Sequence, residues 1–144
     1  MKHLLVLALT LSLSSCATEF KRQWEAAGQQ AAKAGVEGRW EGTWKSEVNG
    51  HHGSLRAIVG PALNPEGDHC FHYHATWKGW LQGAYQATHR VTKGRAIHSF
   101  SGQHQMPRIY GGAYTYSGRI SGDEFSACYQ SAKDKGSYHL RRVR

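Results

Sequence analysis

The chain has 144 residues, and 18 lysines and arginines against 10 acidic residues give it a formal net charge of +8 at pH 7. Such a surface favours anionic partners such as lipid head groups, lipopolysaccharide or nucleic acid. Nucleic acid is not an expected partner, because the basic residues form no long run and the start of the chain indicates export.

Residues 1–15 are typical of a signal peptide for export. Lys2 gives a short basic start, and an apolar run from Leu4 to Leu13 follows it. This run is too short to span a bilayer as a permanent helix. We therefore expect a leader that is removed and takes no part in the fold.

The stretch Leu13-Ser14-Ser15-Cys16 resembles the lipobox of bacterial lipoproteins. The resemblance implies that Cys16 is lipidated and becomes the new N-terminus, and the alternative is an ordinary cleavage site beside a chance cysteine. In that family an Asp after the cysteine favours the inner membrane, whereas this chain has Ala17. The resemblance therefore implies an outer-membrane anchor that faces the periplasm. Each buried acyl methylene contributes about 0.8 kcal/mol, so such an anchor holds a domain at a membrane without a spanning segment.

Residues 16–37 are rich in Ala, Gln and Lys, and Phe20, Trp24, Ala27 and Ala31 recur among them at helical spacing. The pattern predicts a short amphipathic helix followed by a flexible junction. We interpret the segment as a tether between the lipid and the domain. The alternative is a helix that lies on the membrane or closes one end of the domain.

Residues 38–144 have the period-two alternation and the glycine-rich turns of β-structure. They predict an all-β domain with strands at residues 39–47, 53–60, 69–77, 82–91, 95–102, 110–118, 123–130 and 136–143. Every connection is too short for a parallel crossover, so consecutive strands are expected to be antiparallel neighbours.

One face of each predicted strand is consistently aromatic. Trp40 and Trp44 share a face of the first strand, and Phe71, Tyr73 and Trp77 share a face of the third. A sheet with one apolar face and no helix to cover it buries that face by closing on itself, which also removes its exposed edges. We therefore predict an eight-stranded antiparallel up-and-down barrel, with a two-sheet sandwich as the competing architecture.

The stretch Gly42-Thr43-Trp44 is similar to the Gly-x-Trp signature in the first strand of lipocalins and the wider calycin group. The resemblance implies that Trp44 plugs the closed end of the barrel and that a basic side chain from the last strand, Arg141 or Arg142, packs across it. Arg142 is the better match because the alternation places it on the inward face. The other lipocalin motifs and a helix after the last strand are missing, so the resemblance extends to the fold and not to the function.

The stretch "HCFHYHATW" places His72 and His74 on one face of the third strand, with Cys70 beside them. A His-x-His pair can supply two ligands to zinc or copper, and Cys70 could supply a third. The candidates for further ligands are His89, His98 and His104, but nothing in the sequence aligns them. Because the opposite face is aromatic, we expect the two histidines to face solvent. We therefore interpret the two histidines as ordinary surface residues of a strand and not as a metal site, and we expect no cofactor.

Cys70 and Cys128 could form a disulfide, because an exported protein meets an oxidising compartment. In up-and-down order, however, their strands lie across the barrel from each other, whereas bridged cysteines need Cα atoms within about 7 Å. We favour the barrel without the bridge, and the disulfide is the alternative.

No catalytic constellation is found, because nucleophile-elbow, phosphate-binding and dinucleotide-binding patterns are absent. We expect a lipid-anchored, non-enzymatic binding protein whose barrel holds one small apolar or aromatic ligand. The residues expected to orient this ligand are Tyr73, Tyr85, His98, Tyr114 and Tyr116. For any single one of them, simple filling of the core is the favoured role.

Two other functions remain open. The first is a structural or interaction lipoprotein of the envelope, with a fully packed barrel and a basic outer face that docks onto an anionic partner. The second, which ranks last, is an enzyme with a metal site built from the strand histidines.

Overall fold

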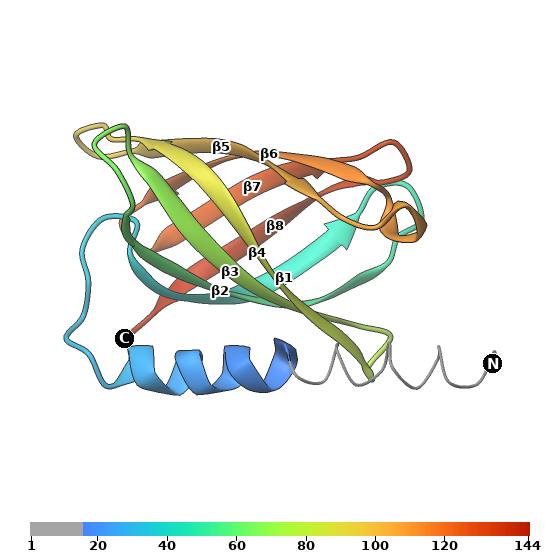
Figure 1. Ribbon diagram of the computed structural model, residues 1–144, viewed down its shortest axis with the longest axis horizontal. Helices are drawn as coiled ribbons and strands as arrows, with labels where there is room; N and C mark the ends of the chain where they lie inside the picture. Colours follow the sequence, from blue (N-terminus) through green and yellow to red (C-terminus); the bar gives the residue numbers. More distant parts are fainter. Residues whose placement is uncertain (1–15) are drawn as a thin grey trace.

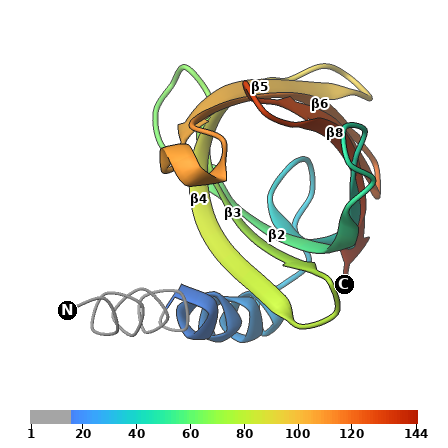
Figure 2. The same cartoon turned by 90° about the vertical axis from the view of Figure 1, so that its right-hand side faces the viewer.

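The computed structural model describes residues 16–144, so the predicted leader lies outside the described residues. The strands are β1 (Gly38–Ser46), β2 (His52–Ala62), β3 (Asp68–Trp77), β4 (Leu81–Thr92), β5 (His98–Gln105), β6 (Ala113–Ser121), β7 (Glu124–Gln130) and β8 (Lys135–Val143). Each pairs antiparallel with the next, and β1 pairs with β8 to close the barrel (Figure 1, Figure 2). The predicted up-and-down barrel is confirmed, and the two-sheet sandwich is excluded.

The predicted strand boundaries are close to the observed ones except at β5 and β6, which both begin three residues later than predicted. The β5–β6 connection contains a 3-10 helix, η1 (Arg108–Tyr110). Two glycines follow it, Gly111 and Gly112, with φ of +107° and +72°. Only glycine adopts this left-handed conformation without strain. The chain therefore turns back at this point, and β6 begins directly after it.

The two ends of the barrel differ in how they are filled. We call the end with the β2–β3, β4–β5 and β6–β7 turns the closed end, and the opposite end the open end. Inward aromatic rings pack edge to face near the closed end. Phe125 meets Trp40 at 5.4 Å and Phe100 at 5.2 Å between ring centroids. The closed half is therefore a solid core.

Trp40 is the tryptophan that seals the closed end. It is fully buried, and its indole N–H donates a hydrogen bond to the Val36 carbonyl over 3.1 Å. The Arg142 guanidinium lies over the indole at 4.2 Å from the ring centroid. Such cation–π contacts are favourable, and more so where water is excluded.

The predicted contact between Trp44 and Arg142 is therefore wrong. Trp44 stands opposite Tyr138 of β8, towards the open end, and its indole donates to the Thr76 carbonyl over 2.9 Å. The chain carries the Gly-x-Trp pattern twice, and the copy ending at Trp40 is the one that meets Arg142.

A helix over residues 16–28 packs along the outer wall of the barrel, below β2 and β3 in Figure 1. Phe20 is only 2% exposed, and its ring lies 5.0 Å from that of His72 and 5.1 Å from that of His74. His72 Nδ1 is hydrogen-bonded to the Gln23 side-chain oxygen at 2.7 Å. The helix is therefore docked rather than a free tether. The prediction that both histidines face solvent is wrong for His72, which is buried, whereas His74 is only partly covered.

Trp24 is the second anchor of this helix. The guanidinium groups of Arg39 and Arg56 lie 5.1 Å and 5.0 Å from its ring centroid. Both arginines belong to the outward faces of their strands, so cation–π contacts hold an aromatic helix face against a polar wall. No helix within residues 16–144 has the length and apolar composition needed to cross a membrane.

Cys70 and Cys128 carry free thiols, and Cys16 is free and exposed. The two strand cysteines lie on β3 and β7, which are not neighbours in the barrel. The disulfide that the sequence left open is therefore absent from the described residues.

Candidate ligand-binding cavity

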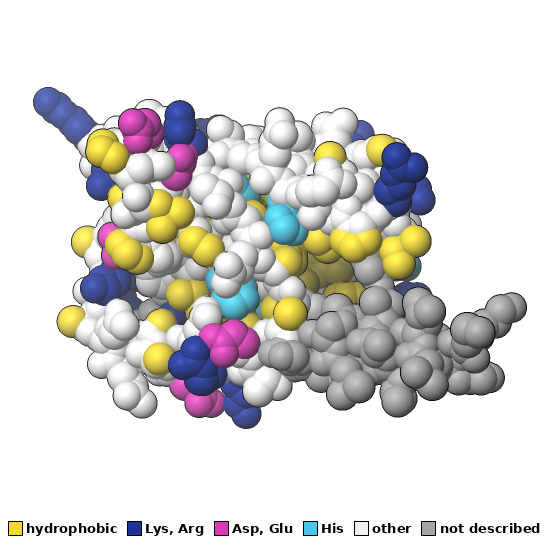
Figure 3. Space-filling view, viewed as in Figure 1, with side chains coloured by type: hydrophobic (Ala, Val, Ile, Leu, Met, Phe, Trp, Pro, Cys, Tyr) yellow, Lys and Arg dark blue, Asp and Glu magenta, His cyan; other side chains and the backbone are white. Residues whose placement is uncertain are grey.

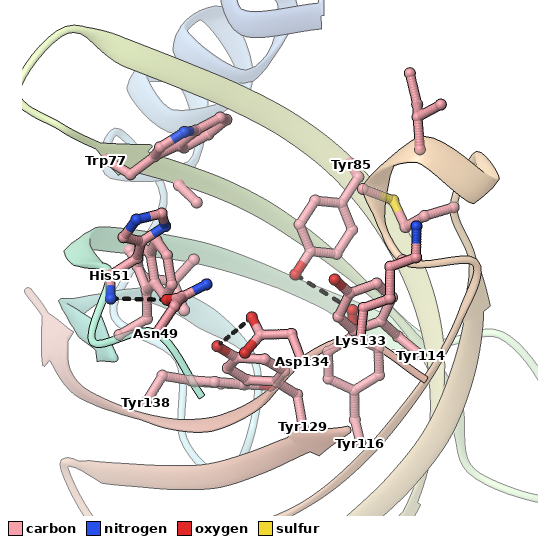
Figure 4. Close-up of a pocket in the computed structure, with 16 residues that line it drawn as sticks. Asn49, His51, Trp77, Tyr85, Tyr114, Tyr116, Tyr129, Lys133, Asp134 and Tyr138 are labelled. Carbon is pink, nitrogen blue, oxygen red and sulfur yellow. Dashed lines mark hydrogen bonds between the residues drawn. The ribbon is translucent and has the colours of Figure 1, made fainter. Parts of the chain in front are cut away.

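The open half of the barrel contains a cavity of about 550 Å³. Small-molecule sites typically have volumes of about 300–1,000 Å³. The inward faces of seven strands and the turns at the open end form its wall (Figure 4). Its lining residues are Trp44, Asn49, His51, Leu55, Ala75, Trp77, Tyr85, Met106, Ile109, Gly111, Tyr114, Tyr116, Tyr129, Lys133, Asp134 and Tyr138.

Inward tyrosines dominate the interior of this cavity. Tyr114 and Tyr116 are two apart on β6 and therefore share its inward face. Their rings stack with centroids 6.3 Å apart. The Tyr116 hydroxyl donates to the Tyr85 hydroxyl over 3.4 Å (Figure 4). The cavity therefore offers aromatic faces together with hydroxyl groups.

A buried hydrogen-bond chain runs from the cavity floor into the core. The hydroxyls of Tyr138 and Tyr73 lie 2.9 Å apart, and the Tyr73 hydroxyl lies 3.0 Å from Nε2 of His89. Burial lowers the pKa of His89 to about 4, so this imidazole is neutral at pH 7. Nδ1 of His89 has no hydrogen-bond partner among the described residues.

The phenols of the cavity are also neutral. Burial raises the pKa of Tyr116 to about 12, and it raises the pKa values of Tyr85 and Tyr138 well above the ordinary value for tyrosine. The charged form of a phenol is disfavoured where water is excluded. The interior therefore provides hydrogen bonds and not charge.

The rim at the β7–β8 turn carries one carboxylate. Asp134 accepts a hydrogen bond from the Ser46 hydroxyl at 2.6 Å. It accepts another from the Tyr129 hydroxyl at 3.1 Å (Figure 4). These bonds tie the turn to β1 and occupy both carboxylate oxygens. Lys133, the adjacent residue, lines the rim and is exposed.

The wall next to the cavity is incomplete between β4 and β5. These strands pair only from His89 to Thr92 on β4, so the first part of β4 separates from β5 (Figure 2). The Tyr85 and His104 rings stack across the separation at 5.2 Å. Figure 3 shows a hollow with hydrophobic side chains on this side of the molecule. Side chains, and not paired strands, therefore form this part of the wall.

The five residues predicted to orient a ligand are divided by depth in the barrel. Tyr85, Tyr114 and Tyr116 line the cavity. Tyr73 is fully buried one layer below it. His98 lies at the closed end near Gly35 and does not reach the cavity.

The residues expected to orient a ligand did not include three aromatic lining residues, Trp77, Tyr129 and Tyr138, or the carboxylate of Asp134. The alternation placed the three aromatic ones on inward faces. Counting the residues along each strand between an inward aromatic side chain and the open-end turn would have identified them.

Among residues 16–144, no third metal-ligating side chain joins His72 and His74. They lie on the outer wall, where His74 Nε2 is hydrogen-bonded to the Gln82 side chain at 2.9 Å. Within residues 16–144, no three His, Cys, Asp or Glu side chains come together as a metal site requires.

Comparisons with protein-family models, curated proteins and solved structures find no match to this chain. The fold and cavity themselves define its class: an eight-stranded antiparallel barrel, the architecture of lipocalins, with one packed half and one hollow half.

Proposed function

We propose that this chain is a binding protein that holds one small ligand in the open half of its barrel. The observation that carries the proposal is the cavity of about 550 Å³, because a scaffold with a fully packed barrel needs no such space. We propose a binding role for it and no catalytic one.

The lining indicates the chemistry of the ligand. Trp44, Trp77 and the inward tyrosines favour an apolar or aromatic body that stacks on ring faces. Neutral hydroxyls favour a ligand whose buried end carries a hydrogen-bonding group without charge. Lys133 at the rim favours an acidic group at the outer end.

We further propose that the protein is a lipoprotein of the cell envelope with a lipocalin-like barrel. The lipobox-like stretch ending at Cys16 supports this location, and the exposed position of Cys16 supports its use as the lipid attachment site. An outer-membrane anchor facing the periplasm follows from Ala17 at the next position. Mass spectrometry of the mature chain tests the anchor, which requires a diacylated cysteine as the first residue.

Filling the cavity tests the binding proposal. Ala75 faces inward from β3 and lines the cavity, so Ala75→Trp should abolish most of the binding of an apolar fluorescent probe such as N-phenyl-1-naphthylamine. Ala113→Trp, an exposed position on β6, is the matched control and should bind the probe like the unmodified chain.

Equal probe binding by both variants, with both folded by circular dichroism, would place the probe outside the cavity and overturn the proposal. Native mass spectrometry of protein taken from its own membrane then identifies the retained ligand by its mass.

A further inference from the structure

Three turns at the open end of the barrel each carry an exposed large apolar side chain. Val48 in the β1–β2 turn, Trp80 in the β3–β4 turn and Ile109 in η1 are 57%, 77% and 72% exposed. Of the five exposed large apolar side chains among the described residues, these three lie around the cavity mouth, and Leu63 and Ile97 lie at the closed end. Trp in particular is enriched where a protein meets the interface of a bilayer.

Basic residues accompany these apolar side chains. Lys78 precedes Trp80 by two positions, Arg108 precedes Ile109, and Lys133 lies in the β7–β8 turn; all three are exposed. The acidic residues of these turns are Glu47 and the hydrogen-bonded Asp134. In Figure 3 the right-hand, open end shows apolar and basic side chains together. The three basic residues of these turns outnumber the two acidic ones, and this excess favours an anionic lipid surface.

The turn that carries Trp80 is tight. Lys78 has a φ of +53° and Gly79 a φ of +76°, so two successive residues are left-handed. Two successive left-handed residues are typical of the two-residue turns that close β-hairpins. Trp80 follows this turn directly and is 77% exposed.

The docked helix points its first residue towards the same end. Phe20 contacts His72 and His74 on β3, whereas a Cβ on Gly28 would meet the Arg39 guanidinium near the start of β1, at the closed end. The helix therefore runs from the open end towards the closed end (Figure 1). Cys16 lies about 6 Å upstream of Phe20 along the helix axis, at 1.5 Å for each residue.

We propose that the open end of the barrel docks onto an anionic lipid bilayer through Val48, Trp80 and Ile109, with Lys78, Arg108 and Lys133 over the head groups. The cavity mouth then faces the membrane, and an apolar ligand passes between bilayer and cavity without crossing water. The docking surface adds a contact by the barrel itself to the proposed lipid at Cys16, and it does not depend on that lipid or on a ligand.

Tryptophan fluorescence on vesicles tests this orientation. The full chain is reconstituted with vesicles of phosphatidylcholine and phosphatidylglycerol whose acyl chains carry bromine, a short-range quencher. Bromine should quench part of the fluorescence of the unmodified chain, and Trp80→Phe should lose most of that quenching. The matched control is the double variant Trp80→Phe with Leu63→Trp, which moves the reporter tryptophan to the closed end. Position 63 suits this purpose because Leu63 is 62% exposed, much like Trp80. This reporter should stay unquenched.

Flotation of the same vesicles separates docking from anchoring. If all variants float but Trp80→Phe is quenched like the unmodified chain, or if the tryptophan at position 63 is quenched, the docking proposal is overturned while the anchor stands. If the unmodified chain does not float, both the docking surface and the anchor are overturned. On vesicles of phosphatidylcholine alone we expect less quenching of Trp80, because the basic residues then have no anionic head groups to bind.

Discussion

Replacement of Arg142 by Ala tests the seal at the closed end. The Arg142 side chain is only 7% exposed, although its strand lies next to solvent. Its guanidinium covers the Trp40 ring and donates hydrogen bonds to the carbonyls of Glu37, at 2.8 Å, and Gly35. It also donates to the Asp123 carboxylate at 3.2 Å. One side chain therefore joins the last strand to the segment that leads into the first.

The expected cost follows from these contacts. A partly desolvated cation–π contact contributes about 0.5–2 kcal/mol, and hydrogen bonds from a charged group contribute about 1.5–3 kcal/mol each. The carbonyls at the barrel end regain water in the variant, so the hydrogen bonds are only partly lost. We expect Arg142→Ala to lower the free energy of unfolding by about 3 kcal/mol, which corresponds to about 10 °C in Tm for a domain of this size.

Arg141 provides the matched control. Its side chain is 81% exposed and pairs with Glu124 on the outer face. Exposed ion pairs contribute about 0–1 kcal/mol, so Arg141→Ala should shift the urea midpoint very little. A double-mutant cycle should find coupling between Arg142 and Trp40 and none between Arg142 and Trp44. Equal losses for the two arginine variants, or coupling to Trp44 alone, would refute the assignment of Trp40 as the plug.

Two further predictions concern the barrel core. Burial lowers the pKa of His89 from 6.5 to about 4. Below about pH 6.5 the unfolded chain therefore binds a proton at His89, whereas the folded chain does not. The free energy of unfolding is highest above that pH and falls by up to about 3 kcal/mol towards pH 4. His89→Gln should reduce this pH dependence of the free energy of unfolding in urea titrations, and an unchanged pH dependence would contradict the burial of His89. A Cβ on Gly42 would lie 1.9 Å from the His139 carbonyl oxygen, so Gly42→Ala should destabilise the fold by about 2 kcal/mol or more. Gly60→Ala, whose nearest contact would be at 3.9 Å, should be nearly neutral in the same denaturation assay, and similar effects at both glycines would argue against this strand spacing.

The strand pattern predicted the barrel because alternation is a local property. Phe71 and Tyr73 are buried inside the barrel, as their spacing predicts. Because the turns are short, consecutive strands can pair only as antiparallel neighbours. The pattern does not say how deep a residue lies along the barrel axis. Tyr73 and Tyr116 both point inward, yet only Tyr116 lines the cavity. The same ambiguity explains why Trp44 was paired with Arg142, since Trp40 and Trp44 share one face.

The position of the helix was hidden for a different reason. Its aromatic face was visible in the spacing of Phe20 and Trp24, but its binding surface on the wall is composed of histidine and arginine side chains. An outward face with polar residues normally predicts contact with solvent. Here imidazole and guanidinium groups present flat faces to aromatic rings, and this contact depends on geometry between segments far apart in the chain.

The division of the barrel into a packed half and a hollow half has a consequence for binding. Tyr138 lines the cavity, but it is only 2% exposed and is hydrogen-bonded to Tyr73 in the core. A ligand that bonds to such a hydroxyl meets a group whose position is already fixed, and preorganised groups lose little entropy on binding. The rim differs, because its residues come from turns. On the proposed function, the fixed groups of the floor would favour affinity, and the turns at the open end would be the place where selectivity arises.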